Sequence, residues 1–160
     1  MVLAGVDRDS FRRACAKFAT GVAIATVRGA DGAPHGLTVN SFTSVSLSPP
    51  LVLICVDHAS AVLLHFRAAT AFGINVLRES QRELSVRFAR KGHDRFDGME
   101  WSAGKTGAPL LEGVLAWLEC LVHQTVEAGD HTIFIGKVVA AAAHAGRPLI
   151  YYESGYHGLR

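Results

Sequence analysis

The chain has 160 residues, of which 49% are hydrophobic and 19% are charged, and its formal net charge is +2. This length predicts one domain with a sizeable core, and the composition excludes an intrinsically disordered chain. The basic residues are scattered apart from one loose group (Arg87, Arg90, Lys91 and Arg95), so we expect no nucleic-acid binding. The high apolar content also indicates that part of the surface is covered in an oligomer.

The cysteines and the apolar runs indicate a reducing compartment. Cys15, Cys55 and Cys120 lie in apolar stretches, and no two of them have metal-ligand spacing, so we expect neither a disulfide framework nor a metal site. The N-terminus has no basic segment followed by an apolar one, and the longest apolar runs are too short to cross a bilayer. We therefore expect a cytoplasmic protein without a membrane segment.

The first element is predicted to be a helix over residues 11–18. Its apolar residues recur at i, i+3, i+4 and i+7, which is one face of a helix: Phe11, Ala14, Cys15 and Phe18. Asp7 or Asp9 is placed to cap the first turn of this helix.

The rest of the chain is rich in strand patterns, which cover residues 22–27, 36–47, 51–56, 71–77, 114–126, 131–142 and 149–152. The near-continuous apolar run at 51–56 is typical of a strand buried on both faces. Two more short helices are predicted, one over residues 61–66 and one from a capping box of Ser80 and Glu83 to about Arg90. About six strands with three short helices favour a closed or half-closed antiparallel barrel over a doubly wound α/β fold.

The common nucleotide-binding and hydrolase motifs are missing. Gly104, Lys105 and Thr106 resemble the end of a phosphate-binding loop, but that loop needs a glycine where this chain has Met99. Gly29, Gly32 and Gly36 do not have the spacing of the dinucleotide-binding fingerprint, and the sequence around them does not predict a βαβ unit. The chain also lacks a G-x-S-x-G elbow and an H-E-x-x-H motif.

Residues 36–53 are the most informative segment, because they place six hydroxyl groups and an asparagine in a strand-like run. The simpler interpretation is a half-exposed strand with its polar face in water. However, the polar residues Thr38, Asn40, Ser41 and Ser44 lie among bulky apolar neighbours. Such a strand offers backbone N–H groups and small hydroxyls, which suit a flat polar ring with several acceptor atoms.

This segment closely resembles the short-chain flavin reductases, the small components of two-component flavin-dependent monooxygenases. Other segments resemble the same family in the same order, namely residues 18–23, 72–77, 81–89, 94–96, 107–113, 129–136, 148–152 and 155–156. The resemblance extends over residues 11–158, so we expect residues 1–160 to form a single flavin reductase-like domain.

The resemblance implies a fold, an activity and partners. The implied fold is mainly β, a six-stranded antiparallel split barrel of the Greek-key, FMN-binding type with a few short helices. The implied assembly is a homodimer with flavin near the subunit interface. The implied activity is hydride transfer from NADH or NADPH to N5 of FMN or FAD, after which reduced flavin diffuses to a partner monooxygenase. The sequence does not choose between FMN and FAD or between NADH and NADPH.

The resemblance also implies the flavin-binding residues. Those expected on the two neighbouring strands are Thr38, Val39, Asn40, Ser41, Ser44, Cys55, Val56 and Asp57. Ser60 is assigned to the flavin phosphate because it is expected at a helix N-terminus, and Arg90 or Lys91 to its counter-charge. The alternatives are a satisfied sheet edge, an ordinary helix cap and a solvated helix end.

Three further residues are candidates for cofactor contacts. Phe72 is expected to pack on a flavin or adenine ring, or else in the core. His131, in a Gly-Asp-His turn, is expected to contact the nicotinamide cofactor, or else only its neighbour Asp130. Tyr152 is expected to close over the site, or else to pack against the end of the barrel. We expect no catalytic acid or base, because the cofactors carry the reaction.

Two other functions stay open at this point. A flavin carrier or sensor without turnover fits the same barrel, because a fold does not determine a function. Another split-barrel oxidase, such as a pyridoxamine phosphate oxidase, is a weaker alternative.

Overall fold

The computed structural model describes residues 4–92 and 95–159. Its helices are α1 (Arg8–Cys15), α2 (Leu63–Ala68) and α3 (Arg82–Ala89), with a 3-10 turn η1 (Glu79–Gln81) before α3. Its strands are β1 (Thr20–Gly21), β2 (Ala23–Arg28), β3 (Pro34–Val39), β4 (Thr43–Leu47), β5 (Pro50–Asp57), β6 (Ala71–Val76), β7 (Trp101–Ala103), β8 (Pro109–Leu111), β9 (Ala116–Ala128), β10 (His131–Ala143), β11 (Ile150–Tyr152) and β12 (Gly155–His157). Asp94, from one segment of the family resemblance, lies outside the described residues.

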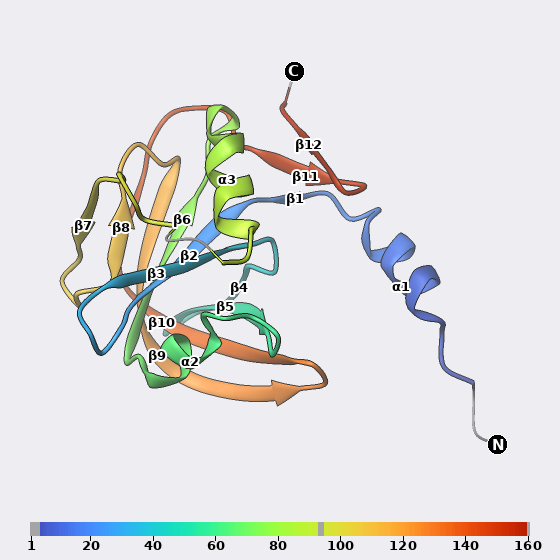
Figure 1. Cartoon of the computed structure of the whole chain (residues 1–160), viewed down its shortest axis with the longest axis horizontal. Helices are drawn as coiled ribbons and strands as arrows, with labels where there is room; N and C mark the ends of the chain where they lie inside the picture. The colour runs from blue at the N-terminus through green and yellow to red at the C-terminus, as the bar shows by residue number, and fades with distance from the viewer. Residues whose placement is uncertain (1–3, 93–94, 160) are drawn as a thin grey trace.

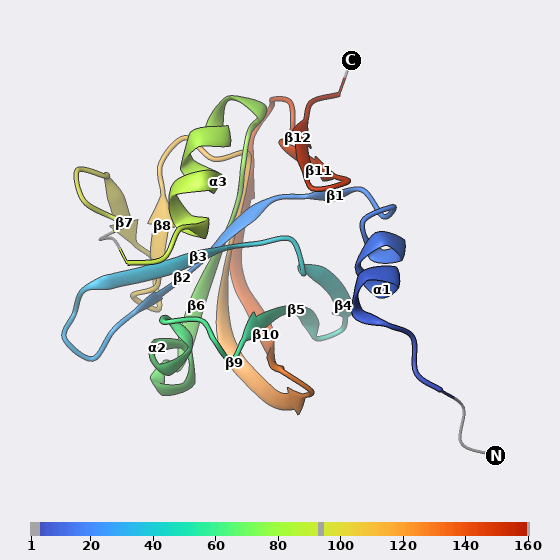
Figure 2. The same cartoon turned by 45° about the vertical axis from the view of Figure 1, so that its right-hand side comes forward.

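One antiparallel sheet dominates the fold, and it curls around a central core (Figures 1 and 2). Its strand order is β3-β2-β6-β9-β10-β5-β4, and two small sheets, β1-β11-β12 and β7-β8, lie beside it. The prediction of a mainly β, antiparallel split barrel with few short helices is therefore confirmed. The main sheet has seven strands instead of six, because the strand predicted over residues 36–47 is two strands, β3 and β4. These two strands lie at opposite ends of the sheet order, so the short connection between them joins the two edges of the sheet.

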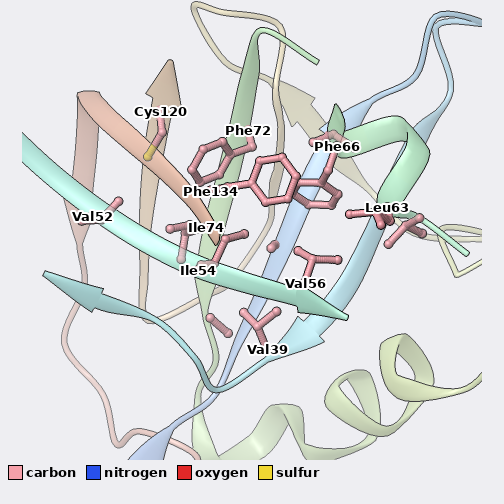
Figure 3. Packing of buried hydrophobic residues seen from close by; sticks show 14 residues of the cluster. Val39, Val52, Ile54, Val56, Leu63, Phe66, Phe72, Ile74, Cys120 and Phe134 are labelled. Atoms are coloured by element: carbon pink, nitrogen blue, oxygen red, sulfur yellow. The ribbon is translucent and has the colours of Figure 1, made fainter. Parts of the chain in front are cut away.

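Phenylalanine side chains fill the inside of the curled sheet (Figure 3). Phe66, Phe72 and Phe134 are each no more than 1% exposed, and the ring centroids of Phe66 and Phe134 lie 5.5 Å apart. Gly136 on β10 makes room for one of these rings. A Cβ atom at Gly136 would lie 2.5 Å from Cζ of Phe72 and 2.7 Å from Cβ of Cys120. The core therefore needs a residue without a side chain at this point of the strand.

A second apolar cluster lies on the other side of β2. Its buried members are Val22, Ile24, Leu77, Phe88, Phe96, Leu111, Val114 and Leu149. Alternate residues of β2 thus contact the two clusters, and this strand is buried on both faces. The prediction that residues 51–56 are buried on both faces is wrong, because burial alternates along β5 and its outer side chains stay partly exposed.

The helices are present where they were predicted, with different ends and packing. Asp7 caps α1, its Oδ1 accepting a hydrogen bond of 2.9 Å from the Ser10 N–H, but no residue of α1 is buried. Phe18, which was predicted on the same apolar face, is 78% exposed, and α1 projects away from the barrel (Figure 1). The capping box before α3 does not involve Ser80. Instead, the Arg78 N–H donates to Oε1 of Gln81.

A buried amide joins β8 to the barrel. Asn75 on β6 is fully buried, and its Nδ2 donates to the carbonyl oxygen of Ile24 (3.0 Å) and to the hydroxyl of Thr26 (3.2 Å). Its Oδ1 accepts from the Leu111 N–H at 2.8 Å, and the Thr26 hydroxyl donates to the Pro109 carbonyl. Every polar atom of this side chain is used, which is what a buried amide needs.

A buried carboxylate holds the loop between β7 and β8. Glu119 on β9 is 1% exposed and accepts hydrogen bonds from the backbone N–H and the hydroxyl of Thr106, the latter at 2.6 Å. Burial raises the pKa of Glu119, but these hydrogen bonds outweigh that effect and hold the pKa below its usual value. Asn75 and Glu119 together anchor the segment of residues 101–111, which turns out to border the candidate site.

In the described part of the chain, no helix is both long and apolar enough to cross a membrane.

A methyl group added at Gly136 tests whether the ring of Phe72 needs a residue without a side chain at this position. Gly136→Ala is expected to destabilise the protein by about 1–3 kcal/mol, because an extra carbon in a packed core forces its neighbours to shift. Chemical denaturation followed by circular dichroism measures the change. Gly21→Ala on β1 is the matched control, since no atom lies within 4 Å of its Cβ position. Equal midpoints for the two variants would contradict the packing argument.

Candidate functional site

The barrel closes where the end of β3 meets β5. Ser41 follows β3, and its hydroxyl accepts a hydrogen bond from the Cys55 N–H at 2.9 Å and donates to the Cys55 carbonyl at 3.2 Å. A side chain thus takes the place of a neighbouring strand for this stretch of β5. We call this contact the seam. It brings the predicted residues that end β3 next to those that end β5, which are about fifteen positions apart in the sequence.

A hollow of about 290 Å³ lies beside the seam, and we call it the small hollow. Four of the predicted site residues line it, namely Thr38, Asp57, Ser60 and Lys91. Leu37, Ala59, Ala61, Phe88, Ala89 and Arg95 complete the lining. The structure therefore brings together residues from the β3 strand, the loop after β5 and the end of α3.

A tight turn presents Ser60 in this hollow. Asp57 Oδ1 accepts from the Ala59 N–H at 2.8 Å, and the Asp57 carbonyl accepts from the Ser60 N–H at 2.9 Å. The predicted helix after Ser60 starts later, at Leu63, so Ser60 is a turn residue and not a helix cap. Within the described residues its hydroxyl makes no hydrogen bond, which leaves it able to bind a ligand.

Two cations border the small hollow. Lys91 is exposed, just beyond the end of α3. Arg95 is partly buried, and its guanidinium donates to the Gly36 carbonyl at 2.6 Å and to the Arg90 carbonyl at 2.8 Å and 3.1 Å. Burial lowers the pKa of Arg95, and no carboxylate of the described residues pairs with it. Arg90 itself is exposed and does not line the hollow.

Arg95 was not predicted as a site residue. The only signal in the sequence was its membership of the loose basic group near α3. Since that signal does not show which cation faces a cavity, only the tertiary contacts select Arg95.

Several predicted residues offer only their backbone or lie apart. Val39 and Val56 point into the barrel interior (Figure 3), so only their main-chain atoms face a ligand. Phe72 is fully buried in the same core and cannot stack on a flavin, which corrects that expectation in favour of its alternative. Asn40 and Ser44 are exposed near the seam.

The hydroxyl of Thr38 and the thiol of Cys55 are also constrained. The Thr38 hydroxyl donates to the Ser85 carbonyl at 2.6 Å, so its proton is committed to α3 and its oxygen can only accept from a ligand. Burial raises the pKa of the Cys55 thiol, which keeps it neutral and unreactive at neutral pH.

His131 and Tyr152 do not line the small hollow. His131 pairs in register with Asp57 across β10 and β5, and its Nδ1 lies 2.7 Å from Oδ1 of Asp130. This hydrogen bond lowers the pKa of Asp130. Tyr152 lies on β11 in the small sheet, with its ring centroid 6.1 Å from that of His157. A nicotinamide contact for His131 stays a prediction.

A second hollow of about 650 Å³ adjoins the first, and we call it the large hollow. Aromatic and imidazole rings gather around it, from His35, His65, Phe96 and Trp101. His35 and His65 stack on each other, with centroids 3.5 Å apart and planes 10° from parallel. No pattern in the sequence predicts this hollow, because its walls come from three segments that share no motif. In the described residues, no three His, Cys, Asp or Glu side chains gather in a way that would hold a metal ion.

The chain is similar to a well-populated group of known proteins. The sequence profile described as a flavin reductase like domain matches residues 15–160. The NADH-dependent FAD reductase of Streptomyces globisporus is 43% identical, over 93% of this chain and 84% of that protein. A solved structure of the NADH:FAD oxidoreductase SgcE6 of Streptomyces globisporus C-1027, in complex with NAD and FAD fragments, has a TM-score of 0.90 and 41% identity to this chain, and the match covers 96% of this chain and 93% of that one.

Some relatives are much longer. The reductase component of the flavin-dependent trigonelline monooxygenase of Acinetobacter baylyi is 44% identical over 93% of this chain, but that match covers only 47% of its own length. A flavin reductase of Rhizobium meliloti is likewise matched over 48% of its length. The chain thus spans about half the length of some of the curated relatives it matches.

Removal of the seam hydroxyl tests whether Ser41 closes the barrel. Ser41→Ala is expected to lower the free energy of unfolding by about 1–3 kcal/mol, because the Cys55 N–H and C=O lose their partner in a partly buried place. Thermal or urea unfolding measures the effect. Ser44→Ala is the control for stability, as its side chain is exposed on β4. An unfolding midpoint for Ser41→Ala equal to that of the unchanged protein would show that the seam contributes nothing.

Proposed function

The chain belongs to the flavin reductase-like family, and from this membership and from its site we propose that it reduces FMN or FAD with NADH or NADPH. In this reaction one hydride and one proton are taken up by the flavin, and the nicotinamide is released in its oxidised form. The observation that supports the proposal most is the small hollow, where two hydroxyl-bearing residues, Thr38 and Ser60, lie with the cations of Lys91 and Arg95.

The residues of the small hollow fit a flavin phosphate. Within the described residues the Ser60 hydroxyl makes no hydrogen bond, and Lys91 and Arg95 form no ion pair, although the Asp57 carboxylate also lines the hollow. Phosphate oxygens accept charge-assisted hydrogen bonds from such groups. The sequence predicted Arg90 or Lys91 as the counter-charge to the flavin phosphate. Lys91 is the better candidate because it lines the small hollow, and Arg95 is a second cation there.

The seam supplies the other half of the binding surface. The main chain of residues 38–41 and 56–57 lies beside the seam, and we propose that it offers N–H and C=O groups to a flat polar ring, whereas those of Cys55 are taken by Ser41. A bound flavin would supply the hydride acceptor, its N5 atom. The protein has to hold the nicotinamide C4 about 3–3.5 Å from that acceptor and to keep water out. Neither task needs a catalytic acid or base.

His131 is proposed to contact the nicotinamide cofactor. Its pairing with Asp57 puts it one strand away from the turn that presents Ser60. Its Nδ1 is held by Asp130, so its Nε2 is the nitrogen left for a ligand. Tyr152 is proposed to act only from outside the small hollow.

The reduced flavin is proposed to diffuse to a partner monooxygenase. This proposal is supported by the relatives, which include the reductase component of a trigonelline monooxygenase and the flavin reductase of a styrene monooxygenase. We also propose that residues 1–160 act as one flavin reductase-like domain in the cytoplasm.

We further propose that the protein is a homodimer. Apolar side chains are left uncovered on two projecting elements, with Leu47 on β4 96% exposed, Phe11 on α1 57% exposed and Phe18 78% exposed. β4 is also an end strand of the main sheet, and an apolar edge strand invites pairing unless another chain covers it. A second copy of the chain is the occupant that the apolar composition and the family resemblance favour.

The activity is tested by NADH oxidation with FMN titrated from zero into excess. Turnover that rises and saturates with FMN is expected. Ser60→Ala and Lys91→Gln are each expected to raise the KM for FMN about tenfold with little change in kcat, since each removes one phosphate contact. Arg147→Gln is the control, because Arg147 is a surface cation paired with Glu79. Flavin binding without turnover would favour a carrier or sensor instead.

The dimer is tested by sedimentation velocity. The unchanged chain is expected to sediment as a dimer at micromolar concentration. The double variant Phe18→Asp with Leu47→Asp is expected to sediment as a monomer, because it puts charge on the two uncovered apolar surfaces. Its circular dichroism spectrum should match that of the unchanged chain. A monomer for the unchanged chain would contradict the proposal, and so would a dimer that is unaffected by both substitutions.

A further inference from the structure

The two hollows adjoin each other, and we call the pair the groove. Ala61 and Arg95 line both of them, so the hollows meet at these residues. β3 runs along the groove, since Leu37 and Thr38 line the small hollow and residues 33–36 line the large one. Figure 2 shows β3 passing between α3 and α2, which contribute to opposite borders. At about 3.3 Å per strand residue, the stretch from Ala33 to Thr38 that lines the two hollows extends roughly 17 Å.

The large hollow has the lining expected for a flat aromatic ligand. His35 and His65 already stack, and each has only one ring face covered by the other. Trp101 adds a further, partly exposed ring, which Phe96 supports from behind: Phe96 is only 7% exposed and its ring centroid lies 6.5 Å from that of Trp101. Stacking on such rings is favourable and does not depend on hydrogen bonds. A purine would therefore be held here mainly by its faces.

Arg95 lies at the junction of the two hollows. Its guanidinium is partly buried, and among the residues that the structure describes it makes hydrogen bonds only to the carbonyl oxygens of Gly36 and Arg90. These neutral partners orient the charge without neutralising it, and partial burial makes an added anion more favourable. Asp97, which lines the large hollow, is an acceptor suited to ribose hydroxyls.

We propose that the large hollow binds the adenosine phosphate half of FAD, with Arg95 on the pyrophosphate and the His35–His65 pair beside the adenine. The protein then selects FAD over FMN, because FMN ends in the small hollow. This inference rests on the proposed function, from which it takes the flavin phosphate in the small hollow. It adds a preference for FAD over FMN, between which the sequence does not choose.

The adenosine phosphate of NADH has the same chemistry as that of FAD. FAD is favoured because the two hollows adjoin each other at the proposed position of the flavin phosphate. The ring-lined hollow begins at the residues that border the proposed phosphate position, namely Ala61 and Arg95. One molecule that passes Arg95 fills both hollows, whereas NADH would have to share this junction with the flavin phosphate.

The test compares the dissociation constants of FAD and FMN for the full chain by titration calorimetry. FAD is expected to bind about tenfold more tightly than FMN. His65→Ala is expected to weaken FAD about tenfold while FMN stays within about twofold, since His65 lines only the large hollow. His65→Phe, which keeps a ring to stack on His35, is expected to restore FAD binding. His123→Ala on β9 is the control, with its side chain exposed outside both hollows.

Arg95→Gln gives a second measurement, the ratio of the two KM values in NADH oxidation. This ratio is expected to shift towards FMN, because FAD loses a contact to its pyrophosphate. The two variants test different parts of FAD, because His65 is proposed to lie beside the adenine and Arg95 to bind the pyrophosphate.

Three results would overturn the inference. One is equal affinity for FAD and FMN in the unchanged chain. Another is an equal loss of both flavins in His65→Ala, which would indicate a structural role. The third is a rise in the KM for NADH in His65→Ala with FMN as acceptor, which would give the large hollow to NADH. By contrast, FAD selectivity without turnover would overturn the proposed reductase activity and support this assignment of the hollow.

Discussion

The structure depends on how the inside of the barrel is filled. Phe66, Phe72 and Phe134 occupy the space that the curled sheet encloses, and the sheet can approach them only because Gly136 has no side chain. Protein interiors pack as densely as organic crystals, so a ring of this size sets the distance between opposite strands. The curvature of the sheet, and with it the meeting of its two edges, follows from this packing.

The candidate site forms where the two edges of the curled sheet approach each other. When the edges of the sheet approach, the end of β3 lies next to β5, and the Ser41 hydroxyl satisfies backbone groups of Cys55 that no strand reaches. Beside this contact, the turn after β5 presents Ser60, whose hydroxyl makes no hydrogen bond within the described residues, and Lys91 and Arg95 border the same hollow. These groups bind and orient. They do not transfer protons, which is in keeping with a reaction whose difficult step belongs to the cofactors.

A different set of buried contacts holds the outer wall of the groove. Asn75 ties β8 to the barrel, and Glu119 holds the loop before it, so the segment from Arg95 to Leu111 lies against the sheet. Phe96 of this segment is buried against Phe88 of α3, with ring centroids 5.0 Å apart. Buried polar groups that are fully hydrogen-bonded fix one arrangement, because any other would leave them unsatisfied. The placement of Trp101, which pairs with Leu111 and lines the large hollow, therefore depends on Asn75 and Glu119, which line neither hollow.

The sequence by itself determined the elements and the chemistry of one edge. Strand and helix periods located the three helices, β11 and the strands of the main sheet but not the short strands β1, β7, β8 and β12. The hydroxyl-rich run at 36–47 suggested a site for a polar ring, and the family resemblance assigned Ser60 and Arg90 or Lys91 to a flavin phosphate. Only the tertiary structure decided where residues 36–47 break into β3 and β4, that Phe72 faces inward, and that Arg95, His35 and His65 line one groove. The physical reason is range. Periodicity and capping act over a few residues, whereas the direction of a side chain and the walls of a cavity are set by packing between segments that are distant in the chain.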